Sequence, residues 1–153
     1  MEYNYKIYTP EKYAFSMGKI ALNKYLESNS KENIMDIKII DISCGSGNLL
    51  LALLEELLKI SKEIFGIYRY SENWITGFDV DMNALKLLEK RAEALFFKYG
   101  ISGKLNIKNC DSLYEKIEEK YDIEIQPTQV SSNTWRSVAG IVELVKEKIE
   151  NNG

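Results

Sequence analysis

Apolar and polar residues recur along this chain in two patterns, one typical of strands and one of helices. Residues 37–43 form a run rich in isoleucine, which is typical of a central parallel strand covered on both faces. Further strands are expected over residues 74–81, 105–111 and 121–125. Because helical patterns separate these runs, we expect an α/β fold with helices on both faces of a doubly wound, mostly parallel sheet of about four strands. We expect this sheet to be incomplete, with an open edge.

Apolar side chains at three- and four-residue spacing predict helices over 10–27, 49–60 and 82–99. Thr9 is the expected cap of the first helix and Asn48 that of the second. Asp81 is expected to cap the third helix, which ends at Gly100. We interpret 28–36 as a loop and 61–73 as a helix end plus a loop, and expect Glu55, Glu56 and Lys59 to be exposed. A last helix, which could cover the open edge, is predicted from Val138, Ile141, Val142, Val145 and Ile149.

These elements are expected to form one domain over residues 1–153. It has an N-terminal helical cap (1–36), an α/β core (37–125) and a divergent C-terminal tail with a helix (126–153). The composition, 45% hydrophobic and 28% charged, is ordinary for a globular chain. The net charge of −3 argues against a chain that binds nucleic acid alone, since such binding depends on phosphate neutralisation. Any DNA contact is therefore expected through a missing or separate domain or subunit.

The chain has two cysteines and no histidine. Zinc sites and histidine-based acid–base chemistry are therefore excluded, and no metal is expected. We expect Cys44 and Cys110 to be reduced thiols in a cytoplasmic protein, because nothing at the N-terminus resembles a signal peptide. The longest apolar run, from Leu49 to Leu54, is far too short to cross a membrane.

A glycine turn joins the first strand to its helix and carries the candidate chemistry. Gly45 and Gly47 allow a sharp bend, which we expect to leave amide groups free to face a ligand. The turn lacks the third glycine of the dinucleotide fingerprint. Asp41, just before the turn, would repel a pyrophosphate and attract a cofactor with a cationic amino-acid end.

Residues 41–48, Asp-Ile-Ser-Cys-Gly-Ser-Gly-Asn, resemble motif I of the S-adenosylmethionine-dependent methyltransferases. The form is similar to that of N6-adenine DNA methyltransferases of restriction–modification systems. The resemblance implies S-adenosyl-L-methionine as cofactor and a Rossmann-like fold. Tyr8, Thr9 and Pro10 match motif X of this family, which lies against the methionine end of the cofactor. The cofactor-binding residues implied within the turn region are Asp41, Ser43, Cys44, Gly45, Gly47 and Asn48.

Two later acidic residues complete the expected site. Asp79 lies near the end of the second strand, where a carboxylate can accept hydrogen bonds from ribose hydroxyls. The segment 77–81 resembles motif II, which assigns that role to Asp79 and adenine packing to Val80. By resemblance to motif III, Asp111 receives a hydrogen bond from the adenine amino group. A helix cap at Asp111 is an alternative on local grounds, and Asp79 alone could be merely solvated.

The pattern departs from the family after the fourth predicted strand. Adenine methyltransferases carry an Asn-Pro-Pro-Tyr element there, which binds the amino group and stacks on the flipped base. This chain has Gln126, Pro127, Thr128 and Gln129 instead. We therefore predict no catalytic residues in this chain and no adenine methylation by it alone.

Three functions stay open from the sequence. The chain is either the cofactor-binding part of a DNA adenine methyltransferase, a non-catalytic scaffold or regulatory module for a partner subunit, or a methyltransferase for RNA, protein or a small molecule. A partner subunit or a second copy of the chain could cover the open sheet edge. The departure from the family pattern after the fourth predicted strand fits a truncated or frameshifted product as well as a native short form.

Overall fold

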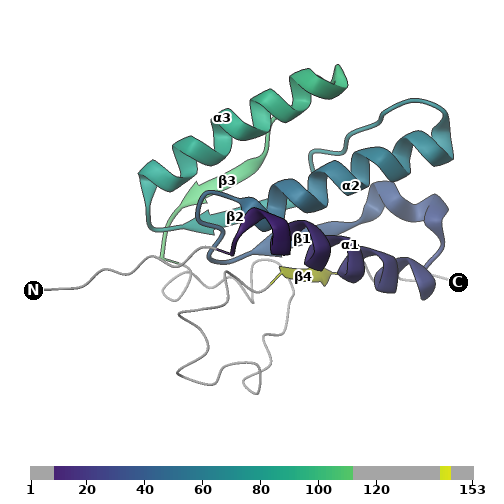
Figure 1. The fold of residues 1–153 in the computed structure, drawn as a ribbon, viewed down its shortest axis with the longest axis horizontal. Helices are drawn as coiled ribbons and strands as arrows, with labels where there is room; N and C mark the ends of the chain where they lie inside the picture. The colour runs from purple at the N-terminus through teal and green to yellow at the C-terminus, as the bar shows by residue number, and fades with distance from the viewer. Residues whose placement is uncertain (1–8, 112–141, 146–153) are drawn as a thin grey trace, which may run out of the picture.

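The computed structural model describes residues 9–111 and 142–145, which form a four-stranded sheet with helices packed against it (Figure 1). The strand order is β3-β2-β1-β4, and β1, β2 and β3 are parallel. The predicted α/β class is therefore confirmed, and the arrangement is compatible with part of a Rossmann-like fold. In chain order the elements are α1 (Glu11–Glu27), the 3-10 helix η1 (Lys31–Asp36), β1 (Lys38–Asp41), α2 (Asn48–Phe65), β2 (Ile75–Asp79), α3 (Met82–Tyr99), β3 (Asn106–Asn109) and β4 (Val142–Val145).

The parallel strands follow one another across the sheet in chain order. Ile39 lies opposite Ile75, and Gly77 lies opposite Ile107. Because both connections step in the same direction, crossovers of one hand place α2 and α3 on the same face. Figure 1 shows these two helices above the sheet, and α1 packs against α2. The prediction of helices on both faces is therefore not met within the described residues.

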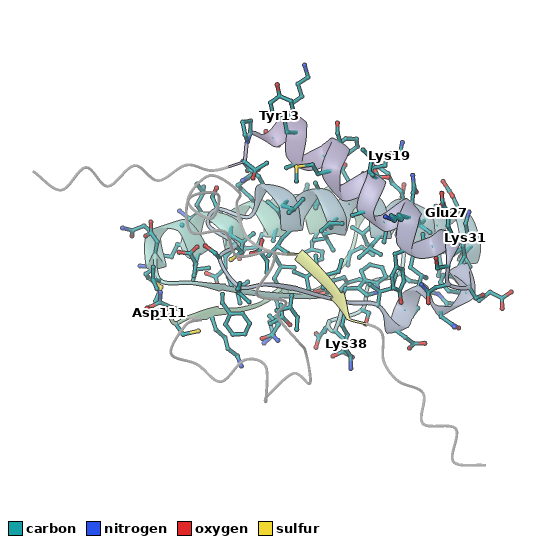
Figure 2. The ribbon with its side chains drawn as sticks, turned by 90° about the horizontal axis from the view of Figure 1, so that it is seen from below. Tyr13, Lys19, Glu27, Lys31, Lys38 and Asp111 are labelled. Atoms are coloured by element: carbon teal, nitrogen blue, oxygen red, sulfur yellow. The ribbon has the colours of Figure 1, made fainter. Side chains whose placement is uncertain are left out.

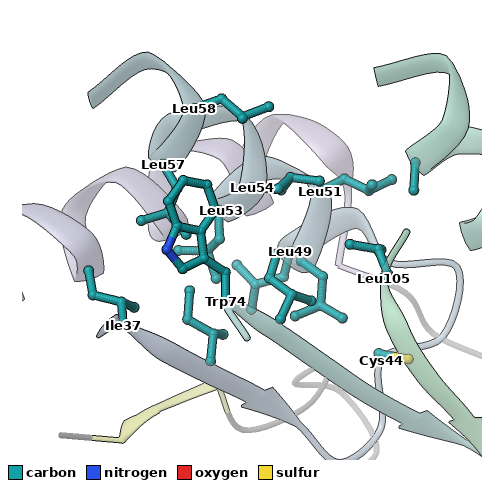
Figure 3. Close-up of a cluster of buried hydrophobic side chains, with 14 of the residues drawn as sticks. Ile37, Cys44, Leu49, Leu51, Leu53, Leu54, Leu57, Leu58, Trp74 and Leu105 are labelled. Atoms are coloured by element: carbon teal, nitrogen blue, oxygen red, sulfur yellow. The ribbon is translucent and has the colours of Figure 1, made fainter. Parts of the chain in front are cut away.

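The core lies between α2 and the sheet (Figure 3). Leu53, Leu57 and Trp74 are almost fully buried there. The Trp74 indole Nε1 donates a hydrogen bond to the Ile34 carbonyl at 2.8 Å, so its polar atom is satisfied without water. Helix α2 is apolar on most of its surface, as expected for a helix covered by both α1 and the sheet. Glu56 was expected to be exposed but is buried, and Lys59 pairs with it at 3.0 Å.

The edge of the sheet beside β1 differs from the prediction. Residues Val142–Val145 form β4, antiparallel to β1, with Glu143 opposite Ile40 and Leu144 opposite Ile39. The helix predicted for this stretch is therefore wrong at 142–145. That prediction rested on the helical spacing of the apolar residues. Without β4, strand β1 would present unpaired backbone groups at the edge of the sheet, and only the tertiary structure shows that residues 142–145 pair with them. The predicted strand over 121–125 lies outside the described residues.

The caps predicted from the sequence are confirmed for one of the three α-helices. Helix α3 has the predicted bounds, with Asp81 accepting from the Asn83 amide and Gly100 in the left-handed conformation. The caps predicted for the other two helices are wrong. Pro10 occupies the N-cap position of α1 without a side-chain cap, and Gly47 occupies that of α2. The Asn48 side chain instead donates to the Thr9 carbonyl. The loop expected over 28–36 contains the 3-10 helix η1.

Neither Cys44 nor Cys110 takes part in a disulfide bond. Among the described residues, no helix combines the length and the apolar character that crossing a bilayer requires.

Candidate functional site

Three carboxylates lie at the ends of three neighbouring parallel strands. Asp41 is the last residue of β1, Asp79 is the last of β2, and Asp111 follows β3. Parallel strands run in the same direction, so their carboxyl ends lie together along one edge of the sheet. Figure 2 shows Asp111 and Lys38, the first residue of β1, toward opposite ends of the sheet.

Asp79 joins this edge to the glycine turn. Its Oδ2 accepts a hydrogen bond from the Gly45 amide at 2.7 Å, and its Oδ1 accepts one from the Asp81 amide at 2.8 Å. Each carboxylate oxygen can accept a second bond, so Asp79 keeps acceptor capacity toward solvent. Its side chain is only partly buried. The sequence places Asp79 correctly at the strand end but does not reveal its bond to the turn.

Most amides of the turn are bonded within the protein. The Ser43 amide donates to Asp41 Oδ1 at 3.0 Å, the Cys44 amide to the Phe78 carbonyl at 2.9 Å, and the Gly47 amide to the Cys44 carbonyl at 2.9 Å. With the Gly45 bond, four turn amides have internal acceptors. The expectation that Gly45 and Gly47 leave free amides is therefore wrong, because the turn folds back onto the end of β2.

Asp41 lies beneath the turn rather than at its surface. Its exposed fraction is 1%. Burial raises its pKa to about 7, the Ser43 amide lowers it, and the nearby Asp79 charge raises it. The buried carboxyl group therefore shapes the turn through its bond to the Ser43 amide rather than through contact with solvent.

Cys44 is buried and close to β2. Burial, followed by the charges of Asp41 and Asp79, raises the pKa of its thiol well above the ordinary range. A Cβ built on Gly77 would lie 3.0 Å from Cys44 Sγ, so glycine is what allows the turn to approach β2 this closely. The thiol is therefore a packing group and not a nucleophile.

Two constraints, one on the backbone and one on packing, require glycine at position 47. Its φ of +80° lies in the left-handed region, and a Cβ there would lie 2.1 Å from Leu88 Cδ1 on α3. The turn can therefore start α2 directly under α3 only with glycine at this position.

Asn48 and Arg91 form a network that the sequence did not reveal. Asn48 Nδ2 donates to the Thr9 carbonyl at 2.7 Å, and Arg91 Nη1 donates to Asn48 Oδ1 at 2.6 Å. The same Nη1 donates to the Ser46 carbonyl at 2.9 Å, and Arg91 Nη2 lies 3.6 Å from Glu11 Oε1. The available signal was the position of Arg91, three residues after the buried Leu88 and so at the margin of the apolar stripe.

The remaining predicted site residues lie around the same edge of the sheet or outside the described residues. Val80 is 66% exposed beside Asp79, and Asn109 Nδ2 donates to the Val80 carbonyl at 2.9 Å. Thr9 is partly buried and Pro10 is exposed. Tyr8 and the four residues at the Asn-Pro-Pro-Tyr position, Gln126, Pro127, Thr128 and Gln129, lie outside the described residues. Within residues 9–111, no three acidic or cysteine side chains gather as a metal site would need.

No protein-family model matches this sequence, and no curated protein matches it either.

Proposed function

We propose that this chain is the S-adenosylmethionine-binding part of a DNA adenine-N6 methyltransferase of the restriction–modification type. The observation that carries the proposal is the row of carboxylates at one edge of the parallel sheet. Asp41 and Asp79 end adjacent strands, and Asp111 follows the next one. Negative charges gathered at a partly desolvated edge favour a cationic ligand, and S-adenosylmethionine carries a sulfonium and an ammonium group.

The bonding of the turn argues against a phosphate-bearing cofactor. Phosphate-binding turns present free backbone amides to the anion. Here the amides of Gly45 and Gly47 already have internal acceptors, and Asp79 stands beside them. A dinucleotide would meet charge repulsion with few free donors to offset it, whereas S-adenosylmethionine has no phosphate to place.

The described residues would have distinct roles in such a site. Asp79 retains lone pairs that could accept from the ribose hydroxyls, and exposed Val80 could pack against the adenine. Asp41 would favour the cationic end through its field. By resemblance, Tyr8, Thr9 and Pro10 would lie toward the methionine end, and Asp111 would accept from the adenine amino group. Ser43, Cys44 and Asn48 would shape the turn rather than bind the cofactor through their side chains.

The proposal assigns no methyl transfer to this chain alone. Attack by an exocyclic amine requires acceptors for its hydrogens, and the sequence has Gln126 and Pro127 where the family has Asn-Pro-Pro-Tyr. A tritium-transfer assay from labelled S-adenosylmethionine to mixed DNA is expected to give background counts only. Transfer above background would contradict this part of the proposal.

One observation favours a second candidate, a scaffold or regulatory module for a partner subunit. The turn is held by Asp79, by the Phe78 carbonyl of β2 and by its own Cys44 carbonyl. A thermal-shift titration separates the two functions, because a ligand that binds only the folded state raises the unfolding temperature. The cofactor-binding function predicts a concentration-dependent rise with S-adenosylmethionine and none with NAD. The scaffold function predicts no rise with either.

A further inference from the structure

We propose that Arg91 is a positioning residue for the cofactor site, which clamps the start of α1 to the glycine turn. The inference rests on the proposed function for its effect on the cofactor, but the clamp itself is a property of the free protein. Arg91 lies on α3, outside every motif that suggested a cofactor, and its side chain is 28% exposed.

One guanidinium group reaches three segments that are distant in the sequence. Nη1 donates to the turn carbonyl of Ser46 and to Asn48 at the start of α2, and Nη2 is paired with Glu11 in the first turn of α1. A planar group with several fixed donors suits this convergence better than a single point charge. One side chain therefore links the turn to the starts of both helices.

Arg91 also fixes which way the Asn48 amide points. A guanidinium can only donate, so the Asn48 oxygen must face Arg91. Its nitrogen is then left to donate to the Thr9 carbonyl, as observed at 2.7 Å. The chain at Thr9 is thus fastened to the turn through an asparagine that Arg91 orients.

No side-chain cap closes the first turn of helix α1 within the described residues. Pro10 at the N-cap position provides no side-chain hydrogen bond. The first helical bonds run from the Tyr13 and Ala14 amides to the Pro10 carbonyl, at 2.9 and 3.0 Å. Loss of the Thr9 contact should therefore loosen these two bonds first.

Hydrogen exchange of the ligand-free chain tests the clamp directly. Arg91→Gln removes the guanidinium, and Asn48→Asp keeps an oxygen for Arg91 but turns an acceptor toward the Thr9 carbonyl. Both variants are expected to speed exchange at Tyr13 and Ala14 about tenfold, because local opening becomes more frequent. The control Lys90→Gln changes an exposed neighbour on α3 and should leave these rates unchanged. Unchanged rates in Arg91→Gln would overturn the clamp, and exchange at Phe96 in the core reports any global loss of stability.

Cofactor affinity tests the positioning role. If only the clamped form binds, the apparent Kd for S-adenosylmethionine rises as the population of that form falls, about twofold where half of the molecules are unclamped. Arg91→Lys should fall between the wild type and Arg91→Gln, because it keeps the charge and part of the reach.

The outcomes separate the two proposals. If the wild type does not bind S-adenosylmethionine, the proposed function fails, and the exchange rates still decide whether the clamp exists. If the wild type binds and Arg91→Gln binds equally well, the positioning role is overturned, whatever the exchange rates show.

Discussion

The backbone amide of Gly45 donates to Asp79 Oδ2 at 2.7 Å, so the carboxylate at the end of β2 holds the turn that follows β1. An ionised acceptor makes this a strong hydrogen bond, and it spans 34 positions of sequence. The same carboxylate accepts the Asp81 amide. Asp79 is therefore structural as well as a candidate ligand-binding group, and experiments must separate the two roles.

Replacing Asp79 by asparagine should lower both stability and cofactor binding. One of its two amide partners, at Gly45 or Asp81, loses its acceptor, which costs about 1–3 kcal/mol. Chemical denaturation measures this loss. The control Glu89→Gln neutralises an exposed carboxylate on α3 and should change the free energy of unfolding little. Equal stability of Asp79→Asn and the wild type would contradict the anchoring role of Asp79.

Gly47→Ala is expected to destabilise the protein far more than Gly66→Ala. Both glycines have positive φ, which costs a residue with a Cβ about 1–2 kcal/mol. At Gly66 nothing lies within 4 Å of the new Cβ, whereas at Gly47 it would meet Leu88 Cδ1. The overpacking should add about 1–3 kcal/mol or more. Equal unfolding free energies for the two variants would show that α3 does not press on the turn.

The buried Asp41 should make the fold less stable as the pH rises. Its folded pKa of about 7 is above the ordinary value near 4 in the unfolded chain. The folded state then binds more protons than the unfolded state between about pH 4 and pH 7, so stability falls through this window, by about 4 kcal/mol at most. The loss is complete above the folded pKa.

Asp41→Asn tests this pH dependence. The amide oxygen can still accept from the Ser43 amide, and no charge is buried. The variant should match the wild type near pH 4 and exceed it in stability at pH 8, as measured by urea unfolding at each pH. Parallel curves for the two proteins would contradict the raised pKa of Asp41. A variant that is more stable but binds S-adenosylmethionine less well would show that Asp41 contributes to ligand binding at a cost in stability.

Local signals in the sequence were sufficient where the interactions are local. Asp81 and Gly100 set the ends of α3, because a cap and a left-handed glycine act within one turn of the helix. The order of strands and acids also placed Asp41 and Asp79 at the ends of adjacent parallel strands. A repeated βα pattern leaves few alternatives for the topology.

Long-range contacts explain what the sequence did not predict. Asn48 is a good cap by type, but Thr9 and Arg91 engage its side chain, and Gly47 occupies the N-cap position. Glu56 appeared exposed by periodicity, although the packing of α1 on α2 buries it. The stretch 142–145 fits a helical spacing and pairs instead with β1. In each case a distant segment decided the outcome.

Calorimetric titration of S-adenosylmethionine into the wild type and Asp79→Asn tests the central claim most directly. The account predicts saturable one-to-one binding to the wild type, much weaker binding to Asp79→Asn and none of NAD to either protein. Absence of binding to a folded wild type, or binding of NAD as tight as that of S-adenosylmethionine, would contradict it.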